Sequence, residues 1–457
     1  MINLFEYQNK FYFEDGFSDL EIFLDEIWNK REKYSYYEND DSEKVETQRF
    51  IEFLHKTKEL KSSKYVGVIH FEGHRINLLP KIFYDSDKSY NDKDIESINK
   101  HILWYLSYCR KIKFPNFISS LSSLKSDFFE VLIYLFSKYT RELLSSSIYQ
   151  QYEEVNNELS NIKGRIDVPV YISENLSKGR WHKVSCSYDS FVMDNKFNRI
   201  IKYVTQLLFN VSKNLDNKKY LREILFILDE VSDVRATAEE CRSLTFNPMF
   251  SDFETVRDYC SLFLSNSISV NYKNDLKLFA FLIPMEYLFE DFIFGFIDKE
   301  LSNATVKSQM RSTSLDKDKI FNLKPDLLIE TKDKKLFIAD TKYKIIYSDK
   351  SDKKEGVSQS DLYQMVSYAI RFNIQDIILF YPNIINQDEE KSSELVILDE
   401  LADRKKINIT IHQLPIINKE LFQNDSDSEN KDLSQIFENT NMQLIRELEK
   451  ILIGENL

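Results

Sequence analysis

The stretch "FNLKPDLLIETKDKKLFIADTKYK", residues 321–344, contains two short apolar runs separated by a polar, lysine-rich segment. Two such runs joined by a few polar residues are typical of a β-hairpin. A turn centred on Asp333 places Asp326 directly opposite Asp340, with their side chains about 5 Å apart. Because successive strand residues point to opposite faces, Asp340 and Lys342 share a face, whereas Thr341 points away from it. The stretch therefore predicts two carboxylates and an ammonium group at one spot.

Two carboxylates this close repel each other unless a cation lies between them. That cation is either the ammonium group of Lys342 or a bound divalent metal. Mg²⁺, with Mn²⁺ as a substitute, suits the site because a hard cation prefers oxygen ligands. A metal-bound water is more acidic, and Lys342 can stabilise developing negative charge, so the group fits phosphodiester hydrolysis. The alternative is a surface hairpin with an ordinary Asp340 to Lys342 contact, contributing at most about 1 kcal/mol.

Helical patterns on either side of the hairpin offer further polar side chains. Upstream, Glu286 and Glu290 lie one helical turn apart in "IPMEYLFEDFIFGFI", so either can supply a third oxygen ligand. Downstream, Gln364 and Tyr368 have the same spacing in "SQSDLYQMVSYAIRF", away from its apolar stripe. A helix with an acid, an acidic hairpin and a helix with Gln and Tyr, in this order, favour a functional site over a chance motif.

Length predicts two to three domains, and composition predicts buried cores without a membrane helix. The 457 residues are 42% hydrophobic, and no apolar run approaches the roughly twenty residues of a membrane helix. The start, "MINLFEYQNKFYFEDG", lacks the pattern of a secretory signal, so a cytoplasmic location is expected. The four cysteines are far apart, which predicts buried free thiols rather than a zinc site or disulfides.

The charge distribution is uneven. The net charge is -13, which argues against a surface made for nucleic acid throughout. Residues 303–354, however, contain thirteen Lys and Arg against eight Asp and Glu, a local excess of five positive charges. A basic surface around the acidic pair suits phosphate attraction, although lysine-rich loops are more often simply solvated.

The order of predicted elements indicates an α+β N-terminal region followed by an α/β domain with a mixed central sheet. We expect a β-hairpin at 64–83, a polar linker at 85–94, a long helical region to about 149, and a strand at 161–172. Asp194 is expected to cap the next helix. From about residue 272, helices and strands alternate, and the chain ends in an acidic loop at 423–432 and an amphipathic helix at 433–453. The predicted regions are 1–150, 151–270 and 271–457.

Other nucleotide and hydrolase motifs are missing from the sequence. It contains no GxxxxGK[ST], GxGxxG, GxSxG or HExxH, and its six histidines are scattered. The carboxylates and the lysine of the hairpin are therefore the best candidates for chemistry.

Together these residues resemble the PD-(D/E)xK nuclease superfamily, with Pro325 and Asp326 as its first element and Asp340, Thr341 and Lys342 as its second. Within it, "LKPDLLI", "IADTKYK" and "DLYQMVSYA" closely resemble McrC, the nuclease subunit of McrBC modification-dependent restriction systems. The similarity extends upstream through "MEYLFEDFI", "KGRIDVPVYI" and "YVGVIHFEGHRINLLPKI".

The resemblance implies roles for individual residues. Asp326 and Asp340 correspond to metal ligands, Lys342 to the catalytic lysine and Glu290 to the helix carboxylate. Gln364 and Tyr368 match a QxxxY element of some superfamily members. Residues 271–457 would thus be a PD-(D/E)xK nuclease domain, and 151–270 a middle connecting region.

The resemblance also implies partners. McrC-like proteins work with a hexameric AAA+ GTPase, McrB, which they stimulate and which usually reads modified DNA. The implied function is that of a DNA endonuclease subunit acting on double-stranded modified or phage DNA, with residues 1–150 binding the partner. Two alternatives stay open: a non-catalytic adaptor that activates the motor, and a stand-alone DNA-processing nuclease. No membrane partner is expected.

Overall fold

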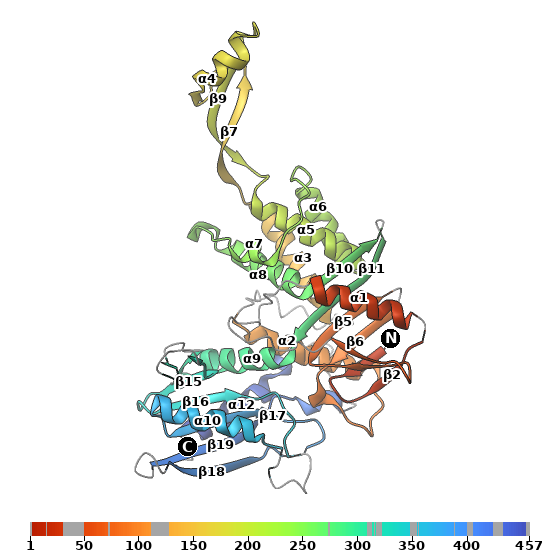
Figure 1. The fold of residues 1–457 in the computed structure, drawn as a ribbon, viewed down its shortest axis with the longest axis vertical. Helices are drawn as coiled ribbons and strands as arrows, with labels where there is room; N and C mark the ends of the chain where they lie inside the picture. Colours follow the sequence, from red (N-terminus) through yellow and green to blue (C-terminus); the bar gives the residue numbers. More distant parts are fainter. Residues whose placement is uncertain are drawn as a thin grey trace. The chain divides into compact units, whose positions relative to one another are not determined.

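The computed structural model covers most of the chain (Figure 1). The residues it does not describe are 1, 15, 31–49, 72–73, 111–127, 273–274, 309–312, 315, 317–321, 348–353, 355, 388, 400–404, 424–432 and 454–457. The expected turn at 72–73 and nearly all of the expected acidic loop lie outside the described residues. So do five basic residues of the 303–354 segment, namely Arg311, Lys317, Lys319, Lys350 and Lys353.

The contacts divide the chain into two compact units. One comprises residues 1–132 and 266–457, and the other comprises residues 133–265. The second boundary lies close to the predicted one at residue 270, whereas the first falls well before residue 150. Most of the predicted N-terminal region therefore belongs to the same unit as the predicted nuclease domain.

A five-stranded sheet organises the N-terminal part of the first unit. Its order is β1 (Ile2–Phe5), β6 (His74–Leu79), β5 (Tyr65–Phe71), β11 (Asp275–Pro284) and β10 (Ser267–Tyr272). β1 and β6 are parallel, and the other neighbours are antiparallel. The pairing of β5 with β6 confirms the hairpin expected at 64–83. Gly67 is required where β5 meets β11, because a Cβ there would collide with the carbonyl oxygen of Phe281.

A small second sheet and a helix complete this part. The sheet has the order β2 (Lys10–Tyr12), β4 (Glu59–Ser62), β3 (Ile51–Leu54), and the helix is α1 (Phe17–Lys30). Apolar side chains from these elements and from β1, β5 and β6 form one buried cluster that includes Leu4, Phe17, Leu60 and Ile69.

Helix α2 (Asp92–Tyr108) begins inside the segment predicted as a linker. The Asn91 side chain accepts the Asp94 N–H, and the Asp94 carboxylate accepts the Asn91 N–H, each at 3.0 Å. Because of this reciprocal capping, with acidic residues in the first turn, the helix includes the last three residues of the expected linker. α2 packs on α9 (Met285–Glu300), where a Cβ on Gly295 would collide with the Tyr108 carbonyl oxygen.

The C-terminal part of the first unit contains a six-stranded mixed sheet, which confirms the expected mixed sheet. Its order is β12 (Ala304–Ser308), β15 (Leu327–Thr331), β16 (Leu336–Thr341), β17 (Asp376–Pro382), β19 (Lys405–Leu414) and β18 (Ser392–Asp399). β16, β17 and β19 are parallel, and the remaining pairs are antiparallel. β13 (Thr313–Ser314) and β14 (Asn322–Leu323) form a separate two-stranded sheet.

Helices cover both faces of the six-stranded sheet. α10 (Gln359–Phe372) contributes Met365, Tyr368 and Ala369 to a buried cluster with alternate residues of β17 and β19. The helix expected at 433–453 is interrupted, forming α11 (Leu433–Ile436) and α12 (Glu438–Ile453). The interruption lies at Phe437, which is fully buried and stacks on Trp104 of α2 at 4.6 Å. Aromatic packing thus overrides the continuous helical pattern.

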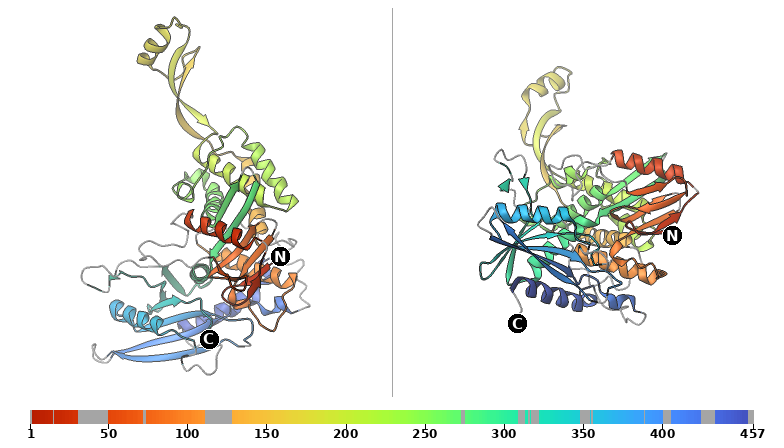
Figure 2. Two further views of the ribbon diagram at one scale, coloured as in Figure 1. Left: turned by 45° about the vertical axis from the view of Figure 1, so that its right-hand side comes forward. Right: turned by 60° about the horizontal axis from the view of Figure 1, so that its bottom comes forward.

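Residues 133–265 combine helices with an arm built on a three-stranded sheet. The helices include the end of α3 (Phe128–Ser146), α5 (Lys196–Val211), α6 (Leu215–Ile227), α7 (Ala238–Arg242) and α8 (Asp252–Asn266). The sheet has the order β7 (Gln151–Leu159), β9 (Val184–Val192), β8 (Arg165–Ile166), and β7 and β9 extend from these helices as the arm (Figure 2). The arm exposes the aromatic residues Tyr152, Trp181 and Phe191.

Two local predictions in this unit were wrong. In the strand expected at 161–172, only Arg165–Ile166 (β8) is extended, and the chain then forms the helical turns α4 (Val168–Val170) and η3 (Tyr171–Leu176). Asp167 accepts the Val170 N–H at 3.2 Å, and a capping acid followed by Pro169 favours a helix start. The cap of α5 is Asn195, because Asp194 is instead paired with Arg199.

The four cysteines match the prediction from the sequence. Cys109, Cys186, Cys241 and Cys260 are all buried and free, as predicted. Within the described parts of the chain, each helix is too short or too polar to cross a lipid bilayer.

The residue after β1, Glu6, is a buried acid. Its carboxylate accepts the Lys81 N–H at 3.1 Å, and only 1% of the residue is exposed. Burial raises the pKa of Glu6 to about 7, although the nearby Lys81 opposes this rise. Between about pH 4.5 and 7, the folded protein therefore keeps a proton on Glu6 that the unfolded chain releases.

We expect Glu6→Gln to gain stability relative to wild type as pH rises. The raised pKa means that wild-type stability at this site is complete below about pH 4.5 and is lost as pH rises towards 7. The stability difference between variant and wild type should grow by up to about 3 kcal/mol between pH 4.5 and 8. Urea unfolding across this pH range measures it, with exposed Glu52→Gln as the control. A pH-independent difference would contradict the assignment.

Candidate active site

The hairpin of β15 and β16 has the register expected from the sequence. Leu327 pairs with Ala339 and Glu330 with Leu336, so the pairing is centred on Asp333. The turn closes when the Thr331 N–H donates to the Lys335 carbonyl at 3.0 Å. Continued by one residue, this register places Asp326 opposite Asp340.

Asp340 and Lys342 lie at the end of β16, next to the parallel strand β17. The Lys342 Nζ is 2.5 Å from Asp340 Oδ2, and the side chains are 18% and 1% exposed, respectively. The Lys342 N–H donates to the Phe380 carbonyl of β17 at 2.8 Å. The ion pair is therefore buried against the sheet and differs from the exposed surface contact considered as the alternative.

Asp326 precedes β15 and is held by the strand that carries Asp340. Its Oδ2 accepts the Thr341 backbone N–H at 2.8 Å and the Thr341 hydroxyl at 2.9 Å. In return, the Asp326 backbone N–H donates to the Asp340 carboxylate. Thr341, which was expected to point away from the site, thus anchors one of the two carboxylates.

The electrostatics of the cluster show that its groups interact. Burial, followed by the charges of Asp340 and Glu290, raises the pKa of Asp326 well above its usual value. By exposed surface, Asp326 is partly buried. Burial also raises the pKa of Asp340, against the opposing effect of Lys342. For Lys342, burial lowers the pKa, but Asp340 outweighs it and the net shift is upward. Lys342 therefore stays cationic.

The structure distinguishes the two glutamates of α9 that the sequence left open. Glu290 is partly buried, and its charge acts on Asp326. Glu286 is exposed, and its charge acts on Glu6 and Tyr7 instead. Of the two glutamates, Glu290 is thus the one whose charge acts on Asp326.

Helix α10 brings Gln364 and Tyr368 to the same place. The Lys342 ammonium donates to Gln364 Oε1 at 3.1 Å, and Gln364 Nε2 donates to the Tyr368 hydroxyl at 2.8 Å. The Tyr368 hydroxyl in turn donates to the Lys324 carbonyl at 3.0 Å, close to Asp326. Tyr368 is 3% exposed and belongs to the buried cluster, so the expectation that it lies away from the apolar stripe was wrong.

We expect Tyr368→Phe to destabilise the protein by about 1 kcal/mol, because the change removes one buried hydroxyl and leaves Gln364 and the Lys324 carbonyl without it. Urea unfolding measures the effect, with Tyr363→Phe on the exposed side of α10 as the control. Equal stability of the two variants would show that the hydrogen bonds of Tyr368 contribute nothing net.

Two further charged residues were missed by the sequence analysis. Lys344 Nζ lies 3.0 and 2.7 Å from the two carboxylate oxygens of Asp361, which is 6% exposed. The charge of Asp361 acts on both Asp340 and Lys342. The signal was present, because Asp361, Gln364 and Tyr368 are spaced to share one helix face and Lys344 continues the alternation of Asp340 and Lys342.

The oxygen donors of this cluster are of the type that a divalent cation prefers. Among the described residues, no three His, Cys, Asp or Glu side chains are gathered closely enough to hold a metal. Asp326 and Asp340, whose pKa values are raised by burial, and Glu290, whose charge acts on Asp326, nevertheless form an all-oxygen set whose charges a hard cation would neutralise.

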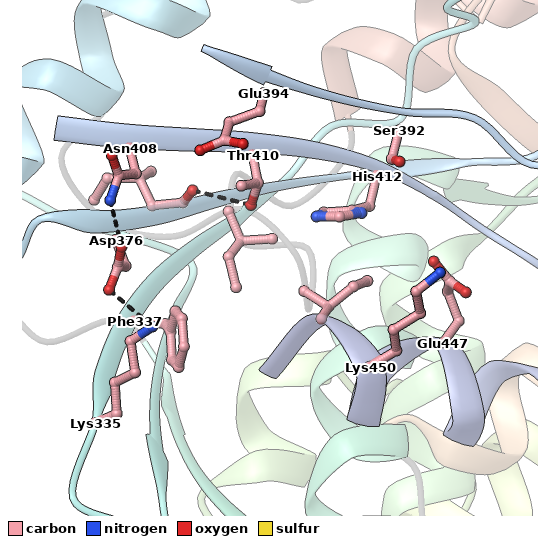
Figure 3. Close-up of a pocket in the computed structure, with 13 residues that line it drawn as sticks. Lys335, Phe337, Asp376, Ser392, Glu394, Asn408, Thr410, His412, Glu447 and Lys450 are labelled. Atoms are coloured by element: carbon pink, nitrogen blue, oxygen red, sulfur yellow. Dashed lines mark hydrogen bonds and ion pairs between the residues drawn. The ribbon is translucent and has the colours of Figure 1, made fainter. Parts of the chain in front are cut away.

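A cavity of about 280 Å³ lies elsewhere, between the sheet and α12 (Figure 3). Its polar residues include Asp376 of β17, His412 of β19 and Lys450 of α12, and Asp376 is paired with Lys335 at 3.0 Å. These strand residues alternate with the β17 and β19 residues that pack under α10, so the cavity is on the opposite face of the sheet. None of the candidate catalytic residues lines it.

Comparisons with known proteins identify the family of the chain. The model of the McrBC 5-methylcytosine restriction system component matches residues 60–382. A chain of the "refined half-complex from tetradecameric assembly of Thermococcus gammatolerans McrB AAA+ hexamers with bound McrC" has 17% identity and a TM-score of 0.63. That match covers 96% of this chain and 99% of the other, and at this identity it shows a shared fold.

A second solved structure is that of the Thermococcus gammatolerans McrBC complex, determined by cryo-EM. Its chain has 18% identity and a TM-score of 0.49, covering 66% of this chain and 88% of its own. No curated protein matches the sequence. Because the family model matches more than half of the chain, the protein belongs to the McrBC 5-methylcytosine restriction system component family.

Proposed function

We propose that this chain is a Mg²⁺-dependent DNA endonuclease subunit of an McrBC-like restriction or anti-phage complex, with a nuclease domain of the PD-(D/E)xK type. The observation that carries the proposal is the cluster at the end of β16. There, the buried carboxylate of Asp340 and the partly buried carboxylate of Asp326 meet a partly buried, cationic Lys342. A structural ion pair needs only one carboxylate, so the second acid at this position supports a catalytic role.

In this proposal Asp326, Asp340 and Glu290 hold the metal. When bound, Mg²⁺ makes its water more acidic and neutralises charge on a phosphate oxygen. Thr341 holds Asp326 in place through its N–H and hydroxyl group. The backbone of Asp326 does the same for Asp340, so each carboxylate is oriented before DNA arrives.

Lys342 stabilises the negative charge that develops on the phosphate during hydrolysis. Its pKa is raised by Asp340, so it carries this positive charge at neutral pH. Gln364 and Tyr368 fix the direction of the ammonium group. Both are therefore proposed to support the site without touching the metal.

The proposed partners are a hexameric AAA+ GTPase and double-stranded DNA. The similar Thermococcus gammatolerans chain belongs to an assembly of McrB AAA+ hexamers with bound McrC, which supports an AAA+ partner for this chain. The sequence itself has no phosphate-binding loop, so a separate motor agrees with this division of labour. We assign partner binding to the N-terminal region.

Plasmid cleavage by the chain co-expressed with an adjacently encoded AAA+ NTPase tests the proposal. Methylated and unmethylated plasmids are incubated in Mg²⁺ with GTP, ATP or no nucleotide. The proposal expects cutting that requires nucleotide. Cutting in Mg²⁺ alone would favour a stand-alone nuclease, and NTPase stimulation without cutting would favour a non-catalytic adaptor.

A further inference from the structure

We infer that Lys81, which lies outside the nuclease domain in the sequence, is a positioning residue for the candidate catalytic lysine. This inference rests on the proposed function and deepens it. The Lys81 ammonium donates to the backbone carbonyl of Tyr343 at 2.8 Å. Tyr343 directly follows Lys342, so Lys81 holds the main chain at the point where it leaves the active-site strand.

The segment after β16 is held from several elements at consecutive residues. The Lys342 N–H is bonded to Phe380 of β17. The Tyr343 carbonyl is bonded to Lys81, and the Lys344 side chain is paired with Asp361 of α10. Without the Lys81 contact, Tyr343 loses its charged hydrogen bond, whereas Lys342 and Lys344 keep their contacts.

Lys81 is itself fixed by the N-terminal sheet. It begins the 3-10 helix η1 (Lys81–Phe83) directly after Pro80, and its N–H donates to the buried Glu6 carboxylate. Its ammonium lies 4.5 Å from the centre of the Tyr343 ring and 5.7 Å from that of Tyr7. The cation thus lies over two aromatic rings, whose faces attract it.

Tyr343 transmits this restraint because it is buried. The residue is 3% exposed, and its ring lies 5.9 Å from that of Phe289 on α9, the helix that carries Glu290. Burial, followed by the charge of Glu6, raises the pKa of Tyr343. A buried ring with a bonded carbonyl leaves little freedom in the backbone beside Lys342. The N-terminal sheet and the catalytic lysine are therefore mechanically linked through Lys81.

Catalysis is sensitive to such a link because displacement of a catalytic group by about 1 Å can cost about 10²-fold in rate. Lys81→Met keeps the aliphatic stem but removes the donor. We expect it to lower the kcat of plasmid cleavage by the full complex about 10- to 100-fold. Lys81→Arg restores a cationic donor and should recover most of the rate. The exposed Lys56→Met is the matched control.

The experiment has two readouts on the full-length chain. The first is kcat at saturating Mg²⁺ and DNA, together with the Mg²⁺ concentration giving half-maximal rate and the stimulated NTPase activity of the partner. We expect only kcat to fall in Lys81→Met. The second is amide hydrogen exchange of the peptide containing 340–347 without DNA or metal, which should become faster in Lys81→Met and not in Lys56→Met.

The outcomes separate this inference from the proposed function. Unchanged exchange at 340–347 in Lys81→Met overturns the positioning role, as does an equal loss of kcat in Lys81→Arg and Lys81→Met. If Lys81→Met does not fold, Lys81→Leu, which also lacks a donor, takes its place under the same criteria. If the wild-type complex does not cut DNA, the proposed function fails, and the exchange measurement alone decides whether Lys81 holds the segment.

Discussion

Asp340→Asn should abolish DNA cleavage while leaving the fold intact. Asn keeps the shape of Asp but lacks the charge to hold a divalent cation, so we expect a loss on the order of 10³-fold or more. Stability should change by no more than about 1 kcal/mol, because the change also removes a buried charge and its repulsion with Asp326. Lys342, freed from the pair, keeps Gln364 as its partner.

The matched control for this variant is Asp333→Asn, which removes the same charge from the exposed turn of the same hairpin. Cleavage is measured as the rate of loss of supercoiled plasmid, and stability as the urea midpoint in EDTA. Cutting by Asp340→Asn at the rate of the control variant would remove Asp340 from the site.

Lys342→Met should also impair cleavage, but it should differ from Asp340→Asn in its effect on stability. Loss of one cationic group that stabilises the transition state is expected to reduce the rate about 10²- to 10³-fold. In addition, Asp340 has 1% side-chain exposure and would be left without its cation. Breaking a buried pair from one side typically costs about 3–5 kcal/mol.

This cost should depend on pH. Burial already raises the pKa of Asp340, and removal of Lys342 removes an effect that lowers it. A carboxylate whose folded-state pKa is raised loses stability as pH rises, so Lys342→Met should be more destabilised at pH 8 than at pH 5. The double variant Asp340→Asn/Lys342→Met should recover much of the loss in urea unfolding. A pH-independent deficit that the double variant does not relieve would show that Lys342 contributes only packing.

Much of the site could be predicted from the sequence because its geometry is local. Alternation along β16 fixes which residues accompany Asp340, and a short turn fixes the register that brings Asp326 opposite. The i,i+4 spacing likewise placed Gln364 beside Tyr368. The part played by Lys81 could not be predicted, because its contact with Tyr343 joins residues 262 positions apart in the chain.

The errors in the fold have physical causes of two kinds. Local capping explains the first kind of error. At Asn91, side-chain hydrogen bonds start α2 where the polar composition predicted a linker. At Asp167, they start helical turns where the β-branched residues predicted a strand. Tertiary packing decided the break at Phe437, which no helical pattern could show. The choice between Glu286 and Glu290 also depended on tertiary packing, because it is set by how α9 is rotated against the sheet.

The most direct test of the central claim is the rate of plasmid cleavage by the full complex as a function of Mg²⁺ concentration, for wild type and Asp340→Asn. Our account predicts a wild-type rate that saturates with Mg²⁺, is abolished by EDTA, and is lost in Asp340→Asn at every Mg²⁺ concentration. Cleavage that persists in EDTA, or that Asp340→Asn performs as well as wild type, would contradict a metal-dependent nuclease site at Asp326 and Asp340.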